Sequence, residues 1–353
     1  MRRPFSVNPV HQLQPNSPVD GQTAASSAIV LPKDQYLHKG APTEWWWHTG
    51  TLNAGGHLYG FEINAASFQE FAFTQVMLTD VQNQKHYQET VILFPPDFRP
   101  DSWAESDPTK PWFANLAKVK MSAPVGADPA QEMNVTATLK DADTKTEIIF
   151  DLNLLQQGPP LIVWGTGVTN PPKPPTVETN NYYYSLTRLK ASGSIKIGSD
   201  PSMDISGVTW MDHEYGLFEN HGKTPSWILQ DMQLGNGVCI SNYSIDTPAL
   251  NKRTDSVATV QRHTGETHFV KTHVTPKRAW KSDKSGKTYF VELLVELPDF
   301  NASISINSLM DSQEFHITKP LPLNVYEGVG TAKGTFEGED VSGTAWIENT
   351  PDP

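Results

Sequence analysis

Two segments far apart in the chain share one pattern, and this repeat limits the folds that the chain can adopt. Residues 184–212 begin with a Tyr and end in ISGVTWMD, while residues 326–348 begin with a Tyr and end in VSGTAWIE. Each copy carries a Gly midway, and each ends with a Trp followed two positions later by an acidic residue. Such a repeat indicates two units that are built on the same plan.

Each half of the chain also opens in a similar way. Residues 44–63 and 225–244 each contain a Trp, a strand-like stretch, a Gly-containing turn and a second strand-like stretch, which is the pattern of a β-hairpin. First and last strands with matching roles favour closure of a sheet into a barrel, because closure leaves no unpaired edge. The sequence therefore predicts two tandem antiparallel β-barrels, over residues 40–216 and 217–353.

The pattern between these landmarks indicates strands rather than helices. The 28 Pro and 24 Gly residues argue against long uninterrupted helices. Alternation and β-branched residues predict strands at 57–68, 133–140, 146–155, 289–297 and 302–309. The stretch 67–76 is ambiguous, and the Pro-rich stretch 169–181 is expected to be a loop of the first barrel. We therefore expect an all-β chain with little helix.

Composition excludes several classes of protein. The 353 residues include 27 basic and 39 acidic ones, a net charge of −12, and no basic run, so no nucleic-acid partner is expected. No stretch of about 18 apolar residues occurs, so no integral membrane segment is expected. The single cysteine, Cys239, excludes an intrachain disulfide, and its apolar neighbours indicate a buried thiol.

The first residues bear on location. Met1-Arg2-Arg3 begins like a signal peptide, but no apolar region follows it. The chain as written is therefore expected to be cytoplasmic, and secretion with the signal already removed is the alternative. Residues 1–39 are expected to form a poorly ordered arm, because residues 4–28 are rich in Pro, Gln, Ser and Ala.

The motifs of the chain, taken in order, resemble those of one family. They are EWWWHTG at 44–50, YYYSLTRL at 182–189, SGVTWMDHEYG at 206–216, WKSDKSGKTY at 280–289, Gln313-Glu314, Tyr326-Glu327-Gly328 and SGTAWIE at 342–348. This ordered set spans about residues 40–350 and resembles the carotenoid 1,2-hydratase (hydroxyneurosporene synthase) family. The resemblance implies two lipocalin-like β-barrels, in agreement with the internal repeat.

The resemblance also implies an activity. Family members such as kievitone hydratase add water to an isoprenoid double bond, and remote fungal relatives are Diels–Alderases. We therefore expect a cofactor-independent enzyme that hydrates a carbon–carbon double bond of a bulky prenylated, terpenoid or polyene metabolite, as a hydro-lyase does. A cyclase or pericyclase and a non-catalytic carrier of an apolar ligand are the alternatives. The sequence contains no Gly-rich phosphate loop and no G-x-S-x-G motif, which disfavours a hydrolase.

One motif suits acid catalysis. Hydration of an alkene requires an acid that protonates carbon and a surface that tolerates a carbocation. Trp210 and Asp212 are two positions apart, so on a strand they face the same way. An apolar pocket raises the pKa of a carboxyl group, and an aromatic face stabilises a cation. The family's aromatic-x-Asp acid centre implies Asp212 as the acid and Trp210 as its cation shield. A turn cap at DHEYG, or an ion pair with Arg188, is the alternative role for Asp212.

The EWWWH motif is a second candidate. On a strand, Trp45 and Trp47 face one way, and Glu44, Trp46 and His48 face the other. We expect the three tryptophans to bind substrate and the Glu44 and His48 side chains to take part in catalysis, with His48 as a base or a water-positioning group. The alternative is that these tryptophans simply fill the core.

Four tyrosines complete the candidate site, and no metal is expected. A phenol can line the pocket, donate a hydrogen bond to the substrate or exclude water from Asp212. The His213 side chain diverges from those of its acidic neighbours, so no metal-ligand set is visible. The tyrosines are Tyr182, Tyr183, Tyr184 and Tyr215.

Overall fold

The computed structural model describes residues 27–68, 70–169, 176–217, 227–244, 248–317 and 323–350. Within these residues the chain is almost entirely β-structure, which confirms the all-β prediction. None of the described helices is long and apolar enough to cross a membrane. The helices are short 3₁₀ turns: η2 (Lys33–Gln35), η3 (Val163–Gly165) and η4 (Pro298–Phe300).

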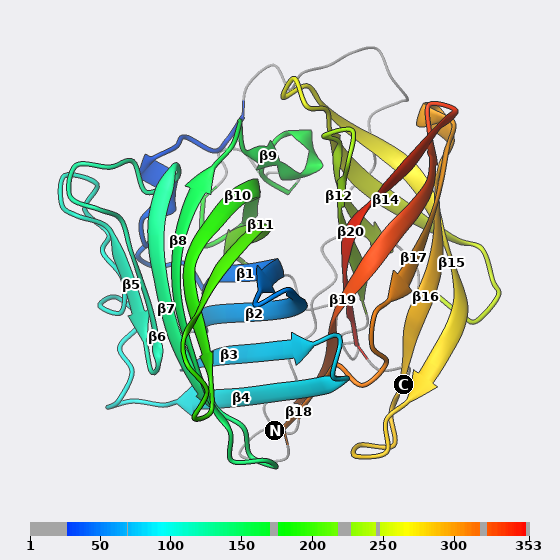
Figure 1. Ribbon diagram of the computed structural model, residues 1–353. Helices are drawn as coiled ribbons and strands as arrows, with labels where there is room; N and C mark the ends of the chain where they lie inside the picture. The colour runs from blue at the N-terminus through cyan, green and yellow to red at the C-terminus, as the bar shows by residue number, and fades with distance from the viewer. Residues whose placement is uncertain are drawn as a thin grey trace, which may run out of the picture. The chain divides into compact units, whose positions relative to one another are not determined.

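Ten strands follow one another across the first sheet, each antiparallel to its neighbours (Figure 1). In spatial order they are β4 (Lys85–Leu93), β3 (Phe71–Asp80), β2 (His57–Phe68), β1 (Thr43–Ala54), β11 (Met203–Gly216), β10 (Asn181–Ile197), β8 (Glu147–Gln156), β7 (Glu132–Lys140), β6 (Val119–Ser122) and β5 (Phe113–Leu116). One further strand, β9 (Leu161–Ile162), has two residues.

The first sheet curls without closing. The predicted pairing of the first and last strands is present, because β1 pairs with β11 along its whole length. That pairing lies in the middle of the sheet, since β1 also pairs with β2. Strands β4 and β5 therefore form the two edges among the described residues. The curl still encloses a core, in which Phe61 of β2 contacts Phe150 of β8 with ring centroids 6.2 Å apart.

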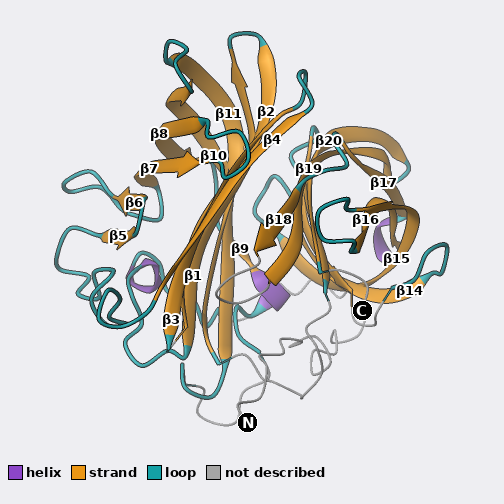
Figure 2. Ribbon diagram, turned by 90° about the horizontal axis from the view of Figure 1, so that it is seen from below, coloured by secondary structure: helices purple, strands orange, loops and turns teal. Residues whose placement is uncertain are grey.

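The second sheet does close. Its strands are β17 (Ala302–Ser308), β16 (Thr288–Leu297), β15 (Thr267–Lys281), β14 (Thr254–Gln261), β13 (Cys239–Ser244), β12 (Ile228–Leu234), β20 (Glu339–Asn349), β19 (Leu323–Phe336) and β18 (Glu314–Ile317). Pairing of β17 with β19 completes an eight-stranded barrel, seen close to end-on in Figure 2, and β18 adds to β19 outside it. Aliphatic side chains such as Met232, Ile240 and Val295 fill its interior.

The chain divides into two compact units. One unit contains residues 28–160 and 171–217, and the other contains residues 161–170 and 218–353. The segment 161–170, which the sequence placed in the first barrel, thus groups with the second. A physical reason is that the Trp164 amide donates a hydrogen bond of 2.9 Å to Oγ1 of Thr259 in β14.

The described part of the N-terminal segment is ordered, which differs from the poorly ordered arm that the sequence predicts. Residues 1–26 lie outside the described residues, but residues 27–39 are folded. Asp34 accepts a hydrogen bond of 2.7 Å from the Val30 amide, and the Gln35 amide side chain is fully buried against the Tyr184 hydroxyl. Composition missed this because a few buried contacts, rather than a long apolar pattern, anchor the segment.

The predicted strands are confirmed, and the ambiguous stretch resolves to strand. The stretches 57–68, 133–140, 146–155, 289–297 and 302–309 match β2, β7, β8, β16 and β17. Within the ambiguous stretch, residues 67–68 end β2 and residues 71–76 begin β3, which is paired antiparallel with β2. The predicted Pro-rich loop at 169–181 falls mostly outside the described residues.

Candidate active site

Strand alternation divides the candidate residues between the two faces of the first sheet. Residues paired across neighbouring strands point to the same face. Asp212 pairs with Trp47 on one side and Ser185 on the other, whereas Met211 pairs with His48. The side chain of Asp212 therefore shares a face with Trp45 and Trp47, which we call the acid face.

Glu44 and His48 point to the opposite face, which we call the histidine face. Trp46 and Tyr184 of β10 also point to the histidine face, because each pairs with His213 of β11. The structure therefore does not bring together all four residues expected to be catalytic. The acid face holds Asp212 and Trp210, and the histidine face holds Glu44 and His48.

On the acid face, Asp212 is a buried carboxyl group, and its hydrogen-bond donors among the described residues are neutral. Its side chain is withdrawn from water, with 8% of the residue exposed. Oδ1 accepts hydrogen bonds from the Ser185 hydroxyl at 2.5 Å and from the Trp210 indole N–H at 2.8 Å. Tyr183 is a third hydrogen-bond donor. Burial raises the pKa of Asp212 to about 6, although these hydrogen bonds act to lower it.

The two structural roles that the sequence left open for Asp212 do not fit this geometry. The residues DHEYG do not form a turn, because β11 continues through Gly216. An ion pair with Arg188 is also not among the described contacts of Asp212, whose partners are hydroxyl and indole groups. The buried surroundings of Asp212 thus favour its protonated form more than water does.

Aromatic rings lie beside the acid on the same face. Trp45 contacts Trp47 edge-to-face, with ring centroids 6.5 Å apart, and contacts Phe68 at 6.3 Å. Phe68 in turn stacks on Phe73 at 5.7 Å. All four rings are half-buried, so they form an aromatic surface that is partly exposed. Such a surface binds apolar ligands and stabilises nearby cations.

On the histidine face, Glu44 is the centre of a buried ion-pair network. Its Oε1 atom lies 2.9 Å from Nδ1 of His38 and 3.0 Å from Nε2 of His213. Its Oε2 atom accepts a hydrogen bond from the backbone amide of His38. Burial acts to lower the pKa of His38, but Glu44 and Asp34 raise it to about 9. Burial acts to raise the pKa of Glu44, but the two histidines hold it below its usual value.

The same three residues are the described group that could hold a metal ion. One ligand atom each from His38, Glu44 and His213 lie within 4.8 Å of one another. The sequence does not mark this group, because only the tertiary structure brings His38 beside two strands. With a pKa of about 9, His38 keeps its proton at neutral pH, so the group as found is an ion pair that anchors residues 27–39.

The environment of His48 is different again. The residue is fully buried, and neither ring nitrogen has a hydrogen-bond partner in the part of the chain that the structure describes. Burial lowers the pKa of His48 to about 3, so the ring is neutral at physiological pH. It lies next to Met211 and Ile63 in the cross-strand register, on the face away from Asp212.

The tyrosine candidates also divide between the faces. Tyr183 shares the acid face with Asp212. Tyr182 stacks on Tyr215 with centroids 5.0 Å apart, and Tyr215 stacks on His38 at 3.5 Å, so both belong to the histidine face. The Tyr184 hydroxyl lies 3.0 Å from Nδ1 of His213. Of the seven residues expected to bind substrate, Trp45, Trp47 and Tyr183 lie with Asp212.

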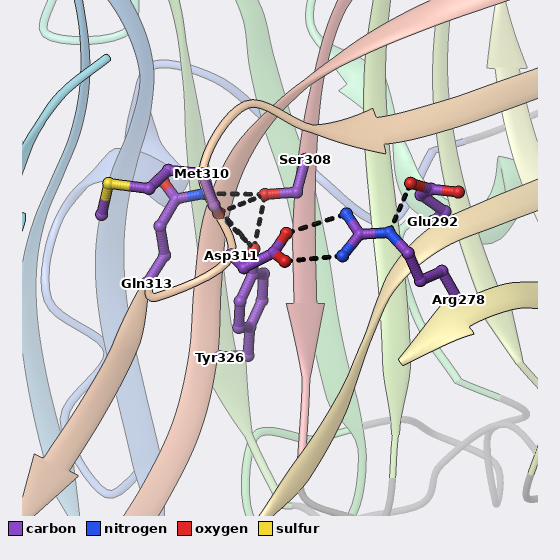
Figure 3. A network of polar contacts seen from close by, with 7 residues as sticks. All are labelled: Arg278, Glu292, Ser308, Met310, Asp311, Gln313 and Tyr326. Carbon is purple, nitrogen blue, oxygen red and sulfur yellow. Dashed lines mark hydrogen bonds and ion pairs between the residues drawn. The ribbon is translucent and has the colours of Figure 1, made fainter. Parts of the chain in front are cut away.

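In the second unit, the motif residues Gln313 and Tyr326 belong to a network of hydrogen bonds. Figure 3 shows the Arg278 guanidinium between Asp311, at 2.6 and 2.8 Å, and Glu292. In the same view the Gln313 side-chain amide and the Tyr326 hydroxyl each form hydrogen bonds with the Ser308 hydroxyl and with the Met310 carbonyl. These bonds hold the loop between β17 and β18 against β19. We therefore place no catalytic residue in this network.

Comparisons with known proteins agree with this architecture. A family model described as AttH-like matches residues 22–350. The dehydratase asqC of Emericella nidulans is 23% identical over 222 residues, which are 60% of each chain. The chain thus spans about 60% of the length of this curated relative.

Two solved structures are similar over almost the whole chain. The protein assigned as AttH (NE1406) from Nitrosomonas europaea has 20% identity and a TM-score of 0.73, covering 95% of this chain and 99% of that one. Kievitone hydratase from Nectria haematococca has 15% identity and a TM-score of 0.71, covering 97% and 98%. At these identities the two likenesses show the fold.

Proposed function

The chain belongs to the AttH-like family, and from that premise we propose that it is a hydro-lyase-like enzyme with Asp212 as its acid. The proposed reaction adds water to a carbon–carbon double bond of a bulky apolar metabolite, or removes water in the reverse direction. The observation that carries the proposal is a buried carboxyl group with a pKa of about 6 beside an aromatic surface. Similarity to a kievitone hydratase and to a dehydratase supports the reaction class.

The proposed step begins with proton transfer from Asp212 to one alkene carbon, which leaves a tertiary cation on the other. The Trp47 and Trp210 rings stabilise this cation. Ser185 and Trp210 stabilise the Asp212 carboxylate, because both donate hydrogen bonds to Oδ1. Water then adds to the cation, and its surplus proton returns to the carboxylate. Dehydration of a tertiary alcohol follows the same steps in reverse.

The test measures product formation with the variant Asp212→Asn, which keeps the shape but has no acidic proton. Purified protein is incubated in D₂O with a panel of prenylated phenols, terpenoid alkenes and the corresponding tertiary alcohols. Mass spectrometry then detects the gain or loss of water and incorporation of deuterium at carbon. Loss of a general acid reduces the rate by about 10²–10⁴-fold, so we expect that loss in the variant.

Asp141→Asn is the matched control, because Asp141 is also buried but accepts its hydrogen bonds from the turn at Thr144 and from the Gln88 amide. We expect this variant to lose stability and to keep the turnover of its folded fraction. Undiminished turnover in Asp212→Asn would contradict the acid role. Products with the mass of the substrate would instead identify a cyclase, and binding without product would identify a carrier.

A further inference from the structure

A pair of buried amides on the acid face has two polar atoms without a hydrogen-bond partner among the described residues. Asn64 of β2 pairs directly with Gln75 of β3, and the two residues are 0% and 1% exposed. Asn64 Nδ2 donates to Oε1 of Gln75 at 3.4 Å. The other polar atoms, Oδ1 of Asn64 and Nε2 of Gln75, have no partner in the described structure.

This unmatched pair does not depend on how the amides are oriented. If both side chains are turned by 180°, Gln75 becomes the donor and Asn64 the acceptor of their mutual bond. One amide carbonyl and one amide NH₂ then still remain unmatched. Buried polar groups nearly always have partners, because an unmatched group loses the hydrogen bonds that water would give it. The pair therefore offers one acceptor and one donor to a ligand group.

The position of the pair relative to Asp212 is set by the strand register. Asp212 pairs with Trp47, Trp47 pairs with Asn64, and Asn64 pairs with Gln75, so all four residues form one row across the sheet. Neighbouring strands are about 4.8 Å apart, which places Asn64 about 10 Å from Asp212. Water that attacks a cation must lie next to the protonated alkene, so a group at this distance contacts a remote part of the substrate.

We propose that Asn64 and Gln75 form a subsite for a hydroxyl group, or another group that both donates and accepts a hydrogen bond, at the remote end of an apolar substrate. A hydroxyl donates to the free carbonyl and accepts from the free NH₂, whereas an ether or ketone satisfies only the NH₂. The Trp47 ring lies between this subsite and Asp212, and it supports the apolar chain. The substrate class is therefore an isoprenoid-bearing phenol or alcohol whose reacting double bond lies about 10 Å from its hydroxyl.

The inference rests on the proposed function only for the reacting end of the ligand, so binding tests it separately. The probes are 4-geranylphenol and its methyl ether, and the readout is quenching of tryptophan fluorescence. We expect the wild-type protein to bind the phenol at least about tenfold more tightly than the ether, because the ether leaves the carbonyl unmatched. The same preference is expected in Asp212→Asn, which cannot turn the probe over.

A double variant locates the preference. Asn64→Leu/Gln75→Leu removes both amides, and we expect it to bind phenol and ether within about twofold of each other. Thr74→Val is the matched control, because Thr74 precedes Gln75 in β3 but points to the other face, and it should keep the preference. Equal binding of both probes by the wild-type protein would overturn the inference and assign the pair to bound water. A preference that persists without any product would refute the proposed function and leave the subsite standing.

Discussion

At the scale of single residues, the fold couples the protonation of Asp212 to stability. The folded-state pKa is about 6, and the ordinary value of the group is 3.8. Between these values the unfolded chain releases the Asp212 proton while the folded chain retains it. The free energy of unfolding therefore falls as pH rises from about 4 to 6, by about 3 kcal/mol for a difference of about two pKa units.

This coupling gives a prediction for Asp212→Asn, whose side chain does not titrate. The stability of the variant relative to the wild type should increase by about 3 kcal/mol between pH 4 and pH 7. Urea unfolding curves of both proteins at the two pH values measure this change. The His38 and Glu44 groups titrate in both proteins, so their effect cancels in the difference. An unchanged difference would show that Asp212 has an ordinary pKa and would remove the basis for its role as an acid.

At the scale of elements, the Ser-Gly pair of the internal repeat has a common steric cause. A Cβ atom at Gly207 of β11 would lie 2.2 Å from the carbonyl oxygen of Thr51 in β1. A Cβ atom at Gly343 of β20 would lie 2.1 Å from the carbonyl oxygen of Gln233 in β12. In both units, then, the last strand approaches the first too closely for any side chain, and Gly is required there.

We therefore expect Gly207→Ala and Gly343→Ala to destabilise the protein by about 1–3 kcal/mol each, because backbone atoms must move to admit the methyl group. Thermal unfolding measures the loss. Ser206→Ala and Ser342→Ala are the controls, since these neighbouring serines are exposed and their replacement should change little. If the glycine variants were as stable as the serine variants, the close approach of the strands would be wrong.

At the scale of the whole molecule, the two sheets differ in how their edges are protected. The second sheet closes on itself through β17 and β19, whereas the first has β4 and β5 as edges among the described residues. Backbone amides on an edge open to water more readily than amides paired on both sides.

Hydrogen exchange should reveal this difference. We expect peptides that cover β4 to exchange faster than peptides that cover β12, which is paired with β13 and β20. Mass spectrometry of the peptides over time measures the two rates. Equal protection of β4 and β12 would contradict an open edge at β4 in solution.

Much of the fold could be predicted from local patterns. Alternation has a period of two in any strand, so the stretches at β2, β7, β8, β16 and β17 were recognisable without tertiary information. The repeated Ser-Gly-x-x-Trp pattern predicted two similar units, and the ordered motifs predicted a family that the AttH-like match confirms. The same alternation also placed Trp45 and Trp47 on the face opposite to Glu44 and His48.

What the sequence by itself determined was which residues share a face of one strand. Only the tertiary structure decided which faces of different strands meet, because register is set by pairing between distant segments. That register puts Asp212 beside Trp47 and Ser185 and separates it from His48. The tertiary structure also brings His38, which precedes β1, to Glu44 and His213. It also aligns Asn64 and Gln75 with the acid, although nothing near either residue in the sequence marks it as part of a site. Pairing between distant segments also decides which sheet closes. The β17–β19 pairing closes the second sheet, whereas no described pairing joins the edges β4 and β5 of the first.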